Sequence, residues 1–133
     1  MGDANIKTIQ GVYEAFGRGD VEAILDVLTD DVDWASEPES SIAPWHGIHR
    51  GKHKVPAFFT TLAETIVVTR FEPLAFASND TDVMSVVRFG LRVPVTSKSG
   101  EMDIHHWFRF RDGKICLYRG TEDTALTASL LAV

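Results

Sequence analysis

The sequence is poor in features that mark several large protein classes. It has one cysteine, Cys116, in 133 residues, so an internal disulfide is excluded, and we expect a cytoplasmic protein. Only 13 residues are basic against 19 acidic, giving a net charge of −6. Because nucleic acids and anionic membranes need a clustered basic face, we expect neither partner. No long apolar run follows the polar N-terminus, so we expect no signal peptide or transmembrane span.

The first half of the chain has the periodicity of helices. Apolar residues at helical spacing predict a helix over 6–16, ended by Gly17 and Gly19. Asp20 is suited to cap a second helix, whose apolar face runs from Val21 to Leu28. We then expect a short strand over 32–34, a loop over 35–50 and a third helix over about 51–65. Pro56 fits that helix only within its first turn.

The second half has the composition and turn signals of strands. We expect strands over 67–77, 83–95, 102–110 and 115–121, followed by a short helix over 124–131 that Asp123 could cap. Pro73 predicts a bulge or a sheet edge, and Asp112-Gly113 predicts a tight hairpin. Helices first and an antiparallel meander afterwards give an α+β layout. We expect residues 1–133 to form one domain.

Four stretches then carry a resemblance to a known family. They are Tyr13-Glu14-Ala15-Phe16 with Gly19-Asp20, Asp30 to Trp34, Trp45-His46-Gly47 with Gly51 and Phe58-Phe59, and His106 to Ile115 followed by Asp123-Thr124-Ala125. In this order they resemble the SnoaL-like group of the nuclear transport factor 2-like superfamily, which includes polyketide cyclases and is related to ketosteroid isomerases. The resemblance implies a cone-shaped domain, with helices on a strongly curved mixed or antiparallel sheet around a pocket, and often a homodimer through the outer sheet face.

His106 is the first residue expected to carry chemistry. Strand alternation places it on one face with Phe108 and Phe110, opposite His105 and Trp107. The resemblance aligns His106 with the protonated aspartate by which ketosteroid isomerases stabilise an oxyanion. A histidine could donate that hydrogen bond or act as a general acid or base. The alternative is a half-buried histidine bonded to a backbone carbonyl.

Glu122 is the second such residue. Tyr118, Gly120 and Glu122 alternate on one face of the last strand, and the resemblance places Tyr118 and Glu122 in the pocket lining. A carboxylate in an apolar pocket should have a raised pKa, which suits proton transfer. The alternatives are a solvated residue at the rim, or a pair with Arg88 or Arg119. For Asp123 the capping role is preferred over that of the late acidic residue of polyketide cyclases.

The sequence also departs from the ketosteroid isomerases. Ser36 stands where they carry the base aspartate, and Val12, with Tyr13 next to it, stands where they carry an oxyanion-hole tyrosine. Steroid isomerisation by their mechanism is therefore not expected.

Aromatic and histidine side chains are expected at the pocket mouth. Trp34, Trp45, His46 and His49 occupy the passage from strand to loop to helix, where rings could grip a flat apolar ligand. For each of them ordinary loop packing is the alternative. The histidine spacings fit no standard ligand motif, so we expect no metal, and we expect no cofactor.

The resulting hypothesis is a cofactor-independent isomerase, cyclase or dehydratase that acts on a small apolar carbonyl compound. His106 and Glu122 would be catalytic. The ligand-binding residues would be Tyr13, Trp34, Trp45, His49, Phe108 and Tyr118. The alternatives are a binding protein for a small apolar or polycyclic ligand, without chemistry, and a dimeric interaction module that uses the outer sheet face.

Overall fold

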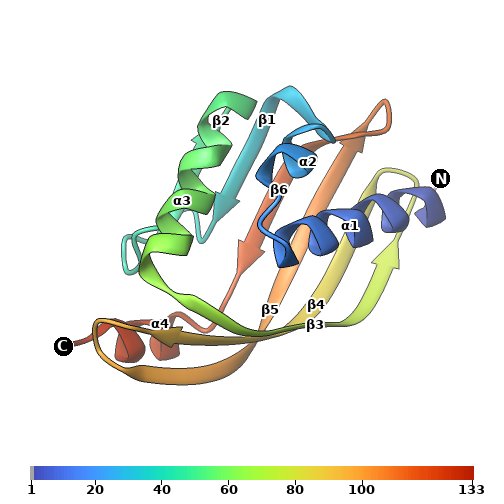
Figure 1. Ribbon diagram of the computed structural model, residues 1–133. Helices are drawn as coiled ribbons and strands as arrows, with labels where there is room; N and C mark the ends of the chain where they lie inside the picture. Colours follow the sequence, from blue (N-terminus) through green and yellow to red (C-terminus); the bar gives the residue numbers. More distant parts are fainter. Residues whose placement is uncertain (1) are drawn as a thin grey trace.

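The computed structural model describes residues 2–133 (Figure 1). Its helices are α1 (Gly2–Gly17), α2 (Val21–Leu25), the 3₁₀ turn η1 (Lys52–Lys54), α3 (Val55–Thr65) and α4 (Thr124–Leu131). Its strands are β1 (Leu28–Ser36), β2 (Gly47–Arg50), β3 (Val67–Ser78), β4 (Asp82–Val93), β5 (Lys98–Arg111) and β6 (Lys114–Thr121). No helix among these residues is long and apolar enough to cross a membrane.

The strands form one six-stranded sheet in the order β2-β1-β6-β5-β4-β3. Strands β3 to β6 pair antiparallel as the predicted meander. Strand β1 adds to this meander in parallel with β6, so the sheet is mixed. Helices α1, α2 and α3 lie over the same face of the sheet, and α4 lies near the opposite end, beside the β4–β5 turn (Figure 1). The α+β cone is thereby confirmed.

The curvature of the sheet has a local cause in β3. This edge strand is bulged between Val68 and Arg70 and again between Pro73 and Ala75, as Pro73 predicted. Bulges bend a strand and increase its twist. Strands β3, β4 and β5 bend together toward the end of the sheet that carries α4 (Figure 1).

Three predicted boundaries between residues 20 and 54 were wrong. Helix α2 ends at Leu25, and Leu28 belongs to β1, which begins earlier than predicted. Leu28 is fully buried and pairs with Ile115 of β6, so tertiary pairing overrides its helical spacing. The expected loop contains β2, which pairs with the end of β1, and α3 begins at Val55 after the 3₁₀ turn.

The two predicted helix caps and the predicted hairpin are confirmed. The side chain of Asp20 accepts a hydrogen bond from the backbone N–H of Ala23, and that of Asp123 from Leu126. Asp112 and Gly113 both have positive φ, as a tight β5–β6 hairpin requires. Each of these features depends on a few consecutive residues, which is why the sequence predicted them.

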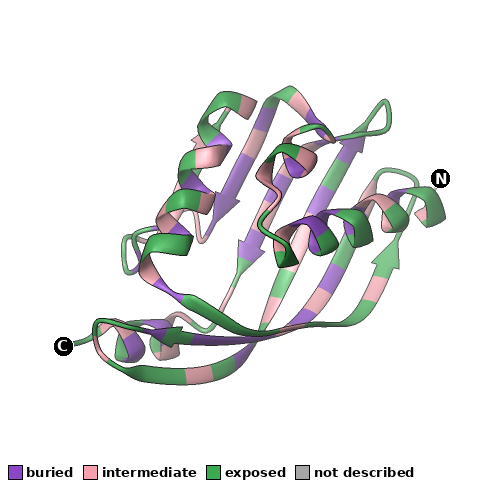
Figure 2. Cartoon of the chain, viewed as in Figure 1, coloured by how far each residue is buried: buried purple, intermediate pink, exposed green. Residues whose placement is uncertain are grey.

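Burial alternates along the central strands (Figure 2). On β4 the buried side chains of Val83, Ser85, Val87 and Phe89 alternate with half-buried or exposed ones. On β5, Phe108 and Phe110 are buried, whereas His105 and Arg109 are exposed. The core therefore lies between the sheet and helices α1 to α3, and the other face of the sheet is largely polar.

Candidate functional site

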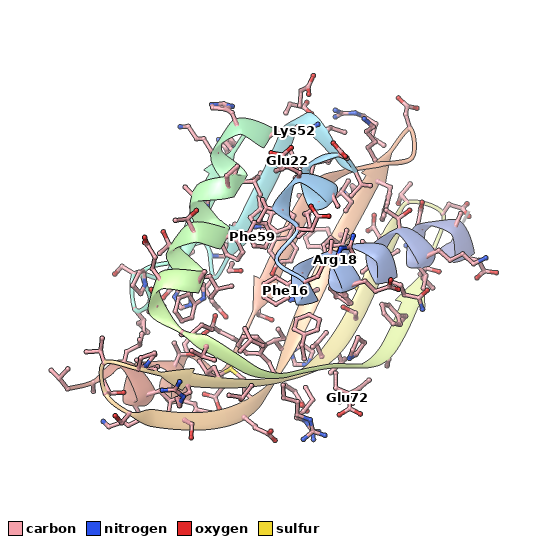
Figure 3. The ribbon with its side chains drawn as sticks, in the orientation of Figure 1. Phe16, Arg18, Glu22, Lys52, Phe59 and Glu72 are labelled. Carbon is pink, nitrogen blue, oxygen red and sulfur yellow. The ribbon has the colours of Figure 1, made fainter. Side chains whose placement is uncertain are left out.

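A cavity lies between the sheet and the helices. Its volume is about 90 Å³, room for several water molecules. Phe16 of α1 and Phe59 of α3 point toward each other above it, with ring centroids 6.1 Å apart (Figure 3). The lining includes Tyr13, Trp34, Trp45, His106, Phe108, Tyr118 and Glu122, and therefore every predicted site residue except His49.

The wall of the cavity on the β1–β6–β5 side is a run of aromatic rings tilted against one another. Trp34 and Tyr118 lie side by side on the parallel pair β1–β6, with ring centroids 4.2 Å apart. Phe108 continues the run, 5.1 Å from Tyr118. Such a wall offers a flat apolar surface with polar groups at only a few points.

One polar group of the cavity is His106. Its Nδ1 lies 2.7 Å from the hydroxyl oxygen of Tyr13, which in turn lies 2.5 Å from Oγ of Ser85. The Ser85 side chain reaches Tyr13 because Ser85 pairs with His106 across β4 and β5, so that both face the helices. Among residues 2–133, Nε2 of His106 has no hydrogen-bond partner, yet it keeps accessible surface. Since His106 lines the cavity, this nitrogen is open to a ligand.

Burial sets the protonation of this group. It lowers the pKa of His106 to about 3, with a smaller contribution from nearby His105. Burial likewise raises the pKa of Tyr13 far above its usual value. At neutral pH the pair is therefore an uncharged imidazole and an uncharged phenol.

The second polar group of the cavity is Glu122. Its Oε1 accepts hydrogen bonds from Nε1–H of Trp45 (3.2 Å) and from Nε2–H of His46 (2.9 Å), and its Oε2 accepts one from the hydroxyl of Thr127. Nδ1 of His46 accepts from the backbone N–H of Ala43, so the His46 proton is on Nε2. A carboxylate has about four acceptor positions, which leaves one on Oε2.

The expected rise in the pKa of Glu122 was wrong. Burial does favour the protonated form, but the donors from His46, Thr127 and Trp45 together outweigh it and lower the pKa. The two arginines considered as partners are engaged elsewhere: Arg88 pairs with Asp103, and Arg119 with Asp33. Glu122 is therefore an ionised carboxylate held by three side-chain donors.

Two further hydroxyl groups face each other near Glu122. Ser36, at the position of the isomerase base, lies 3.3 Å from the Tyr118 hydroxyl and lines the cavity. Burial raises the pKa of Tyr118, so its hydroxyl stays protonated. Gly120 lies beside this pair, and a Cβ there would collide with the Tyr118 hydroxyl. Glycine is therefore required at position 120, because the Tyr118 side chain comes too close to leave room for a Cβ.

Two buried ring nitrogens remain without a partner among residues 2–133. They are Nε1 of Trp34 and Nδ1 of His49. The two residues are neighbours across β1 and β2, and both rings pack against Phe58. His49 contacts the core beside the cavity, and burial lowers its pKa. Its predicted role as a ligand-binding residue remains a prediction.

Ser85 and Thr127 are the site residues that sequence reasoning missed. Ser85 is the one polar residue among the helix-facing positions of β4 from Val83 to Phe89, so strand alternation held a usable signal. No such signal marked Thr127 or the role of His46. Both side chains contact Glu122 from other elements of the fold, and the sequence does not show that these elements meet. Within residues 2–133, no three His, Cys, Asp or Glu side chains are grouped to hold a metal ion.

Comparison with known proteins gives the family. The SnoaL-like domain family matches residues 9–118, so the chain belongs to it. A structure of a nuclear transport factor 2-like protein of unknown function from Burkholderia pseudomallei superposes with a TM-score of 0.90, at 24% identity and 98% coverage of both chains. A nuclear transport factor 2-like protein from Burkholderia xenovorans superposes with a TM-score of 0.88, at 26% identity over 99% of this chain and 98% of that one.

A third structure contains a small molecule. TerC, co-crystallised with polyporic acid, superposes with a TM-score of 0.86, at 22% identity over 96% of this chain and 98% of that one. This similarity shows a shared fold alone. No protein among those of curated function matches the chain.

Proposed function

We propose that this protein is a cofactor-independent acid–base enzyme, of the isomerase, cyclase or dehydratase type, acting on a small apolar carbonyl compound. The observation that carries the proposal is the open Nε2 of an uncharged His106 in an aromatic cavity. A preorganised donor in a dry site stabilises the negative charge that develops on a carbonyl oxygen.

Glu122 is the proposed proton acceptor. Gly120 of β6 pairs with His106 of β5, and Glu122 comes two residues after Gly120, just past the end of β6. Both side chains line the cavity. The ionised state of Glu122 and the free acceptor position on its Oε2 support this role. Trp34, Trp45, Phe108 and Tyr118 would hold the apolar body of the ligand, with Tyr13 and His49 completing the predicted binding set.

The proposal can be tested before the natural substrate is known. Abstraction of a proton next to a carbonyl group exchanges that proton for deuterium in D₂O. We expect the protein to accelerate deuterium incorporation into cyclic ketones, such as 1-indanone and 1-tetralone, as followed by mass spectrometry. His106→Ala and Glu122→Gln should each abolish the acceleration while leaving the fold intact by circular dichroism.

Matched controls are available on the same chain. His105→Ala removes the neighbouring histidine, which faces away from the cavity, and Glu64→Gln neutralises an exposed helix residue. Both should retain the exchange rate. Ketones that bind without any exchange would instead favour the alternative of a non-catalytic binding protein.

A homodimer through the outer sheet face belongs to the same proposal. A groove of about 400 Å³ lies there, lined in part by Met84, Val86, His105 and Trp107, and Met84 is 53% exposed. Light scattering should give twice the chain mass. Met84→Glu should give a monomer, whereas Val95→Glu, in the exposed β4–β5 turn, should not.

The single cysteine remains the reason to propose a cytoplasmic location.

A further inference from the structure

The direction of the hydrogen bonds through Ser85, Tyr13 and His106 decides what the cavity offers a ligand. The three groups form a series in which the Tyr13 oxygen takes part in both bonds. Tyr13 has a single hydroxyl proton, so it donates to one neighbour and accepts from the other. Two directions are possible, and they leave opposite tautomers on His106.

The surroundings of Ser85 select one direction. Ser85 is 4% exposed, and among residues 2–133 its hydroxyl has no partner other than Tyr13. If Tyr13 donated to Ser85, the Ser85 proton would be buried without an acceptor, which is unfavourable. Ser85 therefore donates to Tyr13, and Tyr13 donates to Nδ1 of His106.

We propose that Tyr13, supported by Ser85, is a positioning residue that holds His106 in its Nε2–H tautomer, so that the cavity presents a hydrogen-bond donor and selects ligands with an acceptor oxygen. The inference assigns the Tyr13 hydroxyl a role away from the ligand, although its ring still lines the cavity. Consecutive hydrogen bonds polarise one another, so Ser85 strengthens the donation from Tyr13. The selection of ligands rests on the proposed function, whereas the tautomer does not.

The tautomer can be measured without any ligand. In the full chain labelled with ¹⁵N at its five histidines, His106→Phe identifies the His106 signals by their loss. We expect Nε2 to carry the proton and Nδ1 to be an acceptor, unchanged between pH 7 and about pH 5. A proton on Nδ1, or a charged ring at pH 7, would overturn the proposal.

Two variants separate the roles of Tyr13 and Ser85. Tyr13→Phe keeps the ring and removes the hydroxyl, and we expect a measurable fraction of the Nδ1–H tautomer. Ser85→Ala should retain the Nε2–H tautomer, because Tyr13 then has only His106 to donate to, but with a weaker hydrogen bond at Nδ1. Ser85→Thr, which restores a hydroxyl, should return that signal toward its original position. An unchanged tautomer in Tyr13→Phe would refute the role of Tyr13.

Ligand selection is tested with two molecules of the same shape. 1-Indanone has an acceptor oxygen and indane has none. We expect 1-indanone to bind roughly 2- to 12-fold more tightly, the range of one ordinary hydrogen bond. The preference should disappear in His106→Phe and decrease in Tyr13→Phe. Equal binding of the two molecules by the unmodified protein would refute the selection.

The two proposals fail in different ways. An Nε2–H tautomer with no deuterium exchange in any ketone leaves the positioning role standing and removes the catalytic one. Exchange that depends on His106, together with an Nδ1–H tautomer, would remove the positioning role and leave catalysis standing.

Discussion

Oε1 of Glu122 lies 2.9 Å from Nε2 of His46, whose side chain is fully buried. This contact joins the end of β6 to the segment before β2, which also carries Trp45. The backbone N–H of Glu122 adds a second link, donating to the carboxylate of Glu37 (2.7 Å). The residue proposed to move a proton is therefore also a structural anchor of the cavity.

The anchor predicts coupled effects on stability. Glu122→Gln and His46→Ala should each reduce the free energy of unfolding by about 1.5–3 kcal/mol, as expected for a hydrogen bond to a charged group. The double variant should lose less than the sum of the two, because both remove the same contact. Urea unfolding of the unmodified protein, the two single variants and the double variant measures this coupling. The exposed Glu64→Gln should change stability by less than about 0.5 kcal/mol.

Glu122 also predicts a loss of stability in acid. Its folded pKa lies below the ordinary value of 4.5, so above that pH its charged form stabilises the fold. As the pH falls below about 4.5, the unfolded chain takes up the proton first and stability decreases. Thermal unfolding between pH 5 and pH 3 should show this decrease, and Glu122→Gln should show less of it. An identical slope in the variant would contradict the assignment.

His106 predicts a second loss of folding stability, which begins at a higher pH than the loss caused by Glu122. Its pKa is about 3 in the folded protein against an ordinary 6.5, so between these values the unfolded chain binds the extra proton. Stability should fall as the pH drops below 6.5, by up to about 1.4 kcal/mol per pH unit from this group. His106→Phe should flatten the curve between pH 6.5 and 5, whereas the exposed His105→Gln should not.

Gly120 predicts a steric test of the cavity. A Cβ at this position would meet the buried Tyr118 hydroxyl and lie 3.1 Å from Oγ of Ser36. Gly120→Ala should therefore cost about 1–3 kcal/mol of stability, the usual cost of overpacking. It should also weaken binding of 1-indanone. Gly11→Ala, where a Cβ meets nothing within 4 Å, is the matched control and should bind normally.

The three tryptophans predict a fluorescence signal for binding. Trp34 and Trp45 line the cavity, whereas Nε1–H of Trp107 donates to Asp82 on the other face of the sheet. Binding of 1-indanone should change the emission of the unmodified protein and of Trp107→Phe alike. Trp34→Phe and Trp45→Phe should each lose part of the change. A response that vanished only in Trp107→Phe would place the ligand outside the cavity.

Local sequence signals predicted the elements with sharp boundaries. Asp20 and Asp123 cap helices, Pro73 lies at a bulge of an edge strand, and Asp112-Gly113 forms the hairpin. Strand alternation grouped His106 with Phe108 and Tyr118 with Glu122, and the family resemblance assigned these faces to the pocket, which they border. These features depend on neighbours in the chain, whose backbone preferences are readable from residue type.

Contacts between distant residues were decided by the tertiary structure. Leu28 left its helical pattern because β1 pairs in parallel with β6, from which it is separated by most of the chain. The pKa of Glu122 fell because Trp45, His46 and Thr127 converge on one carboxylate. Burial alone, which the sequence suggested, would have raised it.

The sequence by itself thus determined the helices, the meander, the family resemblance and the face that carries His106. The packing of α1 against β4 and β5 determined that the Tyr13 hydroxyl lies between Ser85 and His106. The physical reason is that alternation selects the face on which a side chain lies, whereas its hydrogen-bond partners, and hence its proton, depend on elements brought together by folding.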